Sequence, residues 1–95
     1  MLRIDPKYSK AHYNLGDILL SQGKMKKAVT HYAKTIEFRP DDVQTYNKIG
    51  IVLFKQGKLK KAGVFFSKAV QIKPSYTEAQ KNIALLKKTL TSSKK

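Results

Sequence analysis

Apolar residues recur along the chain with the spacing of amphipathic α-helices. In two segments they fall at positions i, i+4, i+7 and i+8, which lie on one face of a helix. These positions are Ala11, Leu15, Ile18 and Leu19, and then Thr45, Ile49, Val52 and Leu53. A second helical stripe follows each of them, at Met25, Ala28, Val29, Tyr32 and Ile36, and at Leu59, Ala62, Phe66, Ala69 and Val70. No segment alternates convincingly with the period of two that a strand requires, so the pattern predicts no strand.

Glycine and proline divide these stripes into helix pairs. Gly23 and Gly57 each follow the first stripe of a pair, where a left-handed residue commonly ends a helix. Pro40 and Pro74 follow the second stripe and stop it. Residues 41–44 and 75–78 are typical of capping boxes that start the next helix. Each unit is therefore predicted to be helix–turn–helix.

The units are copies of one another. Pro6, Pro40 and Pro74 are each 34 residues apart, and the same offset places Gly16 on Gly50 and Ala28 on Ala62 without an insertion. Internal repetition at such a period indicates a stacked repeat protein. The predicted organisation is a single domain over 1–95. It consists of a remnant of a preceding repeat (1–6), two repeats (7–40 and 41–74), a capping helix (75–90) and a disordered tail (91–95).

The third copy is incomplete and carries one apolar stripe, at Ala79, Ile83, Leu86 and Leu90. Lys87 stands where the second copy has Leu53, and no second helix follows. This helix is expected to cap the stack and to present its other side to water. We expect an all-α fold of about five helices, arranged as two hairpins plus the cap.

The repeated motif resembles the tetratricopeptide repeat family. The family pattern W-x2-L-G-x2-Y … A-x3-F … P appears as His12-x2-Leu15-Gly16-x2-Leu19 … Ala28-x3-Tyr32 … Pro40. The second copy reads Tyr46-x2-Ile49-Gly50-x2-Leu53 … Ala62-x3-Phe66 … Pro74. The resemblance covers nearly the whole chain and implies an α-α superhelix, a tetratricopeptide repeat solenoid. His12 replaces the large aromatic residue of the pattern and is expected to be a buried packing residue.

Composition excludes several kinds of chemistry. The 95 residues contain no Cys and only two His, and no Ser, Thr or Lys has the base and orienting group that a nucleophile needs. We therefore expect no enzyme, no metal site and no cofactor. Asp41 and Asp42 are better explained as helix-start residues than as an acid/base pair. No apolar run reaches the roughly 18 residues of a membrane helix and no signal peptide precedes the repeats, which favours a soluble, cytoplasmic protein.

The resemblance implies a groove on the concave side, lined by the first helices, that binds an extended peptide of a protein partner. The positions that map to this groove are Tyr13, Asp17, Leu20, Gln44, Asn47, Ile51, Phe54, Lys55, Lys81, Leu85 and Lys88. One subgroup of the family clamps the carboxylate of an acidic chaperone tail with Lys, Asn and Arg residues. The matching positions here are Tyr13, Asp17, Lys48, Glu78 and Asn82, and none fits, so this ligand is rejected.

Charge suggests a second surface. With 20 Lys+Arg against 6 Asp+Glu, the formal net charge is +14. Much of it repeats every 34 residues, at Lys24, Lys26, Lys27 and Lys34, and again at Lys58, Lys60, Lys61 and Lys68. This could be an anion ridge that binds nucleic acid or an anionic membrane. Arg3 and Arg39 are the only arginines, which favours the simpler interpretation of solvated lysines.

Two further alternatives concern assembly. The apolar edge of the first helix is expected to face water unless residues 1–5 or a second chain cover it, which suggests self-association through the N-terminal face. The chain could also be the assembly tail of a larger bacterial protein that carries a helical array.

Overall fold

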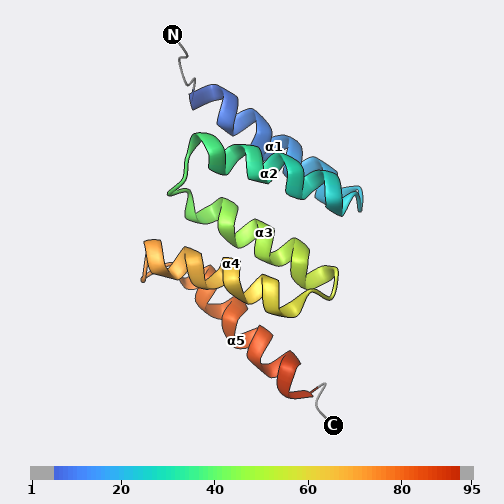
Figure 1. Ribbon diagram of the computed structural model, residues 1–95, viewed down its shortest axis with the longest axis vertical. Coiled ribbons are helices and arrows are strands. Elements are labelled where there is room, and N and C mark those ends of the chain that lie inside the picture. The colour runs from blue at the N-terminus through green and yellow to red at the C-terminus, as the bar shows by residue number, and fades with distance from the viewer. Residues whose placement is uncertain (1–5, 93–95) are drawn as a thin grey trace.

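The computed structural model of the protein describes residues 6–92 and shows five α-helices stacked as a ladder, with successive helices antiparallel (Figure 1). The helices are α1 (Pro6–Ser21), α2 (Met25–Phe38), α3 (Val43–Lys55), α4 (Leu59–Ile72) and α5 (Thr77–Ser92). No strand occurs within residues 6–92, so the all-α prediction is confirmed. The molecule is elongated, with extents of 54 × 30 × 18 Å.

The helices pack in the order of the chain. The most extensive contacts are within the hairpins, between α1 and α2 and between α3 and α4. The hairpins are joined through α2 against α3, and α4 packs on α5 in the same way. The first helices of the second and third units, α3 and α5, also contact each other. The contacts are therefore between neighbours, as in a repeat stack.

The two hairpin turns are set by glycine. Gly23 and Gly57 have φ angles of 79° and 81°, in the left-handed region where a side chain is strained. This conformation lets the following amide turn back, so that the N–H groups of Lys24 and Lys58 donate to the carbonyls of Leu19 and Leu53, both at 2.9 Å. The predicted role of both glycines is confirmed.

The predicted capping boxes differ from the structure. Asp42 precedes α3 at the N-cap position, but its side chain does not accept a backbone N–H. Its carboxylate instead accepts the hydroxyl of Thr45 at 3.0 Å, because a Thr one turn into the helix offers a competing donor. The third unit has Tyr76 at the corresponding place, and its hydroxyl donates to the Glu78 carboxylate at 3.3 Å.

The ends of the outer helices also differ from the prediction. The helix predicted over 75–90 runs from Thr77 to Ser92, so residues 91 and 92 of the expected disordered tail are helical. Pro6 begins α1, where its fixed φ and missing N–H are tolerated. Residues 1–5 and 93–95 lie outside the described residues, as does most of the predicted remnant of a preceding repeat.

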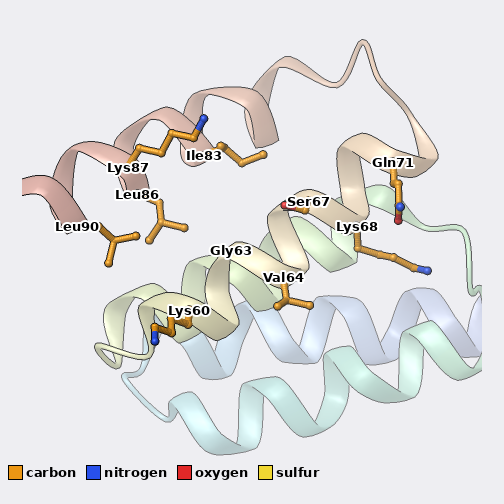
Figure 2. Close-up of a pocket in the computed structure, with 10 residues that line it drawn as sticks. All are labelled: Lys60, Gly63, Val64, Ser67, Lys68, Gln71, Ile83, Leu86, Lys87 and Leu90. Carbon is orange, nitrogen blue, oxygen red and sulfur yellow. The ribbon is translucent and has the colours of Figure 1, made fainter.

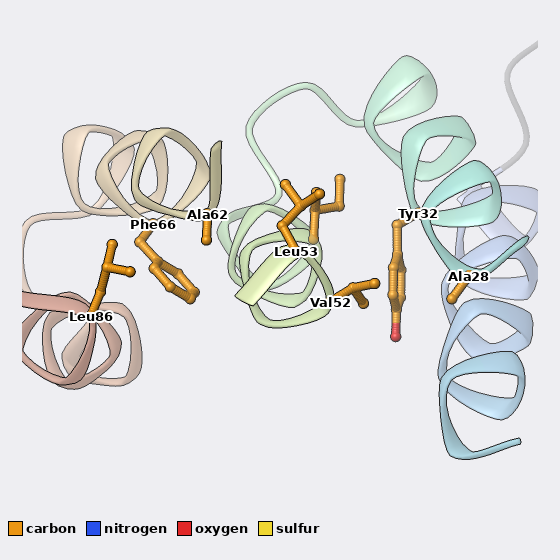
Figure 3. Packing of buried hydrophobic residues seen from close by; sticks show 8 residues of the cluster. Ala28, Tyr32, Val52, Leu53, Ala62, Phe66 and Leu86 are labelled. Carbon is orange, nitrogen blue, oxygen red and sulfur yellow. The ribbon is translucent and has the colours of Figure 1, made fainter. Parts of the chain in front are cut away.

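Each hairpin is closed by a glycine that faces an aromatic ring. A Cβ atom at Gly16 would stand 2.6 Å from the Tyr32 ring, and one at Gly50 would stand 2.5 Å from the Phe66 ring. Tyr32 and Phe66 are both fully buried, and Ala28 and Ala62 lie beside them in the core (Figure 3). Small residues at the crossing therefore allow the helices to approach and the rings to fill the layer between them.

The core does not extend equally to both ends. Leu15 and Ile18 of α1 are 40% and 52% exposed, whereas Ile49 and Val52 of α3, at the same repeat positions, are 2% and 0% exposed. The difference arises because α2 packs against α3, while no preceding helix is present among the described residues to cover α1. The stripe that the sequence predicts is thus buried in the second repeat and partly exposed in the first. None of the helices in residues 6–92 has both the length and the apolar character needed to cross a membrane.

Candidate functional site

A groove lies between α3 and α5, on the side formed by the first helices of the units. Its volume is about 470 Å³. Its lining residues are Ile51, Phe54, Lys55, Phe66, Asn82 and Leu85. Four of these, Ile51, Phe54, Lys55 and Leu85, are among the residues predicted for a peptide groove. We refer to this hollow and its six lining residues as the α3–α5 groove.

The walls of this groove come from helical spacing. Ile51, Phe54 and Lys55 lie at i, i+3 and i+4 on α3 and therefore share one face. Leu85 projects from α5 and is 52% exposed. An exposed leucine beside two half-buried apolar side chains gives the groove an apolar wall, with the exposed Lys55 ammonium at its edge.

Asn82 is a groove residue that the sequence prediction missed. Its side-chain amide donates to Oδ1 of Asn47 at 2.8 Å, which joins α5 to α3. Asn47 itself was expected to face the groove, but it is 2% exposed and its carbonyl oxygen is used in this bond. The pair could have been found by noting that the first helices of neighbouring units run side by side.

The α1 residues predicted for the groove do not line the α3–α5 groove. Tyr13 is half-buried, and its ring centroid lies 5.7 Å from that of Tyr32. Asp17 accepts the Tyr32 hydroxyl, and its carboxylate lies 3.6 Å from the Lys48 ammonium of α3. Leu20 packs against the hydrophobic core. These three side chains therefore have structural partners within the stack.

Carboxylates lie close to two tyrosines of the stack, Tyr13 and Tyr76. Burial, and then the charges of Asp17 and Asp42, raise the pKa of Tyr13 to about 12. Burial and the charge of Glu78 likewise raise the pKa of Tyr76 to about 12. Both tyrosines therefore stand where negative charge is close by.

The remaining predicted groove residues and the predicted anion ridge are exposed. Gln44, Lys81 and Lys88 point to solvent on α3 and α5. All lysines of the ridge are exposed as well, namely Lys24, Lys26, Lys27, Lys34, Lys58, Lys60, Lys61 and Lys68. Lys24 and Lys58 occupy the N-cap positions of α2 and α4. A cation there faces the positive end of the helix dipole. At an exposed site this unfavourable interaction costs about 0.3–1 kcal/mol.

The two histidines of the chain meet between α1 and α2. Nδ1 of His12 lies 3.2 Å from Nδ1 of His31, and the rings stack with centroids 5.4 Å apart. Phe38 extends the stack, at 6.2 Å from His12. His12 is thus half-buried rather than fully buried, and His31 is also half-buried. Within residues 6–92, no three His, Cys, Asp or Glu side chains are grouped so that they could hold a metal ion.

Comparison with known proteins identifies the repeats. Three sequence models of the tetratricopeptide repeat match the chain, over residues 1–30, 16–57 and 43–76. No curated protein matches the chain significantly.

Among 117 solved chains with a similar fold is a crystal structure of MamA, which is 24% identical and has a TM-score of 0.85. The match covers 92% of this chain and 51% of that one, so this chain spans about half the length of the MamA chain. At this level of identity the similarity concerns the fold.

Proposed function

Because the chain belongs to the tetratricopeptide repeat family, whose arrays are protein-interaction scaffolds, we propose that it binds a peptide of a partner protein in the α3–α5 groove. The proposal is a non-enzymatic binding role. The observation that carries it is the exposed apolar wall formed by Ile51, Phe54 and Leu85 from two helices. An apolar surface rimmed by polar groups is typical of a peptide-binding site.

The chemistry of the first-helix side defines the peptide that would fit. An apolar side chain of the peptide would pack between Phe54 and Leu85, and Lys55 would favour a carboxylate next to it. Toward the starts of α3 and α5, Asp42 and Glu78 would favour a basic residue. The expected ligand is therefore an extended segment with an apolar anchor and opposite charges on its two sides.

Selection from a random peptide library tests this proposal. Peptides enriched on the intact chain are measured by fluorescence anisotropy against the wild type and against Leu85→Glu. Because the substitution places a charge in the apolar wall, the affinity should fall at least about tenfold. The control is Ile18→Glu, since Ile18 is also 52% exposed but lies on α1. Equal weakening by both variants, or unchanged binding to Leu85→Glu, would show that the groove is not the binding site.

A second candidate function is electrostatic binding of nucleic acid or anionic membrane through the anion ridge. It is favoured by the full exposure of lysines that recur in register on α2 and α4. Binding of this kind weakens steeply with salt, because each neutralised phosphate releases counterions. Affinity for a 20-mer oligonucleotide and for phosphatidylserine vesicles, measured at 50 and 200 mM salt, separates it from peptide binding. Flat affinity across that range, or no binding to either polyanion, excludes it.

A further inference from the structure

A second groove runs along the other side of α5, between α4 and α5, and has a volume of about 690 Å³ (Figure 2). Gly63 and Val64 of α4 and Ile83, Leu86 and Leu90 of α5 contribute its apolar lining. Val64 is 65% exposed, the most exposed large apolar side chain in the described part of the chain. We call this hollow the α4–α5 groove. It shares no lining residue with the α3–α5 groove.

The groove is flanked by a side of α5 against which none of the other helices in residues 6–92 packs as a hairpin partner. In the second repeat, Leu53 occupies the position of Lys87, and it is buried because α4 packs against α3. Among residues 6–92, no helix packs against α5 in the way that α2 packs against α1 and α4 against α3. Lys87 is accordingly exposed. The repeat geometry thus leaves room beside α5 for one more helix.

The charges around the groove indicate which kind of partner would bind there. Lys60, Lys68 and Lys87 line it, and none of its lining residues is acidic. A helix similar to α4 would bring lysines of its own against these three. A second copy of this chain is disfavoured in the same way, because its net charge is +14. The complementary occupant has an apolar stripe with carboxylates on both flanks.

We propose that the α4–α5 groove binds an acidic amphipathic helix of a partner protein, which packs its apolar stripe on Val64, Ile83 and Leu90 and pairs its carboxylates with Lys60, Lys68 and Lys87. The helix lies along the α4–α5 groove, beside the side of α5 that carries Lys87. Its binding surface is separate from the peptide groove proposed above, so that the chain has two sites.

The test uses a peptide derived from α4. The 14 residues Leu59–Ile72 are synthesised with K60E, K61E and K68E, which keeps the apolar stripe and makes the flanks acidic. Its affinity for the intact chain is measured by fluorescence anisotropy in 150 mM salt. Two peptides serve as references: one with the unmodified α4 sequence, and one with the acidic composition in scrambled order. Both should bind at least about tenfold more weakly, because the unmodified peptide lacks the acidic flanks and the scrambled peptide lacks the apolar stripe.

Variants of the chain locate the peptide. Val64→Glu and Lys87→Glu should each weaken binding at least about tenfold, while circular dichroism shows an unchanged fold because both side chains are exposed. The matched control is Thr30→Glu, which places the same charge at the corresponding position of α2 and should bind like the wild type. Equal binding of the scrambled peptide, unchanged affinity of Val64→Glu, or a comparable loss in Leu85→Glu would each overturn the proposal. The last result would place the helix in the α3–α5 groove.

Discussion

The crossing of each helix pair depends on a glycine that faces an aromatic ring. Gly50 lies against Phe66, which is 1% exposed and is enclosed by the core. Gly63 is also helical, but its neighbour is a methyl group of Leu86, 3.0 Å from where a Cβ would stand. The Leu86 contact involves the end of a flexible side chain, whereas a Cβ at Gly50 would stand 2.5 Å from a rigid aromatic ring. Two helical glycines of one chain therefore have different roles.

Alanine substitution should separate these roles. Gly50→Ala is expected to lower the free energy of unfolding by about 1–3 kcal/mol, because the added methyl overpacks the Phe66 ring. Gly63→Ala should leave it unchanged or raise it by up to about 1 kcal/mol, because helix propensity improves. Urea unfolding followed by circular dichroism measures both. A loss in Gly63→Ala as large as that in Gly50→Ala would contradict this assignment.

The buried hydroxyl of Tyr32 makes stability depend on alkaline pH. Burial, and then the hydrogen bond and charge of Asp17, raise the pKa of Tyr32 above its usual value of 10.0. The folded state therefore keeps this proton when the unfolded state has lost it. The stability that the hydroxyl contributes is complete below pH 10 and is lost as the pH rises further.

Tyr32→Phe should show both effects. At pH 7 it should cost about 1.5–3 kcal/mol, because the Asp17 carboxylate loses its donor. Between pH 9.5 and 11.5, however, its free energy of unfolding should decline less than that of the wild type. Urea titrations across this range check the slopes, and tyrosinate absorbance shows when the group ionises. Parallel decline in the two proteins would mean that Tyr32 does not titrate on unfolding.

Single-residue contacts were the part of the fold that the sequence predicted least well. The period placed His12 on the inner face of its helix, but it could not show that His31 would meet it, since the register of two helices depends on the turn between them. Once Gly23 is known to end α1, His12 and His31 stand at similar distances from the turn, and their contact follows. A capping motif likewise could not show that the Thr45 hydroxyl would compete with the backbone N–H groups for the Asp42 carboxylate.

At the scale of elements, the helices and their turns were predictable because each signal is local. The helical period of apolar residues, with glycine and proline at the helix ends, predicted five helices. The 34-residue repeat predicted which of them pair. The α3–α5 groove was predicted in part, since Ile51, Phe54 and Leu85 follow from the repeat positions. Tyr13 and Asp17 of α1 were also predicted for the groove but do not line it, because the Tyr13 ring lies against that of Tyr32 and Asp17 accepts the Tyr32 hydroxyl. The same contacts that stabilise α1 remove its side chains from the site.

A hydrogen bond between two asparagine side chains joins α3 to α5. Asn47 and Asn82 are joined at 2.8 Å, and removing either side chain leaves the other amide without its partner in a buried contact. Asn47→Ala and Asn82→Ala should each lower the free energy of unfolding by about 1–3 kcal/mol. The double variant should cost less than the sum by about 0.5–3 kcal/mol, because the pair is lost only once. Additive effects in a urea-unfolding cycle would show that the bond does not couple the helices.

At the scale of the whole molecule, repulsion between the excess positive charges opposes the compact folded state. The net charge of +14 is spread over a stack of only 54 × 30 × 18 Å, and a single ion pair, Lys48 with Asp17, is found among the described side chains. Repulsion between lysines should therefore destabilise the fold at low salt. The Debye length falls from about 10 Å at 0.1 M to about 3 Å at 1 M ionic strength, which is enough to screen neighbouring helices from one another.

Salt should consequently stabilise the protein. The free energy of unfolding in urea is expected to rise between 50 and 500 mM NaCl. The gain should be smaller in the double variant Lys27→Glu/Lys61→Glu, in which two exposed lysines at the same repeat position are reversed. An equal or larger gain in the double variant would show that salt acts through something other than screening of the lysines.

The central claim is that the extended peptide of a partner binds in the α3–α5 groove and not on the anion ridge. The most direct measurement is a ¹H–¹⁵N NMR titration of the intact chain with a library-selected peptide. The account predicts that the amides of Ile51, Phe54, Asn82 and Leu85 shift most and that those of Lys26, Lys34 and Lys68 stay in place. Shifts concentrated on the lysines of α2 and α4, and abolished by 200 mM salt, would contradict it.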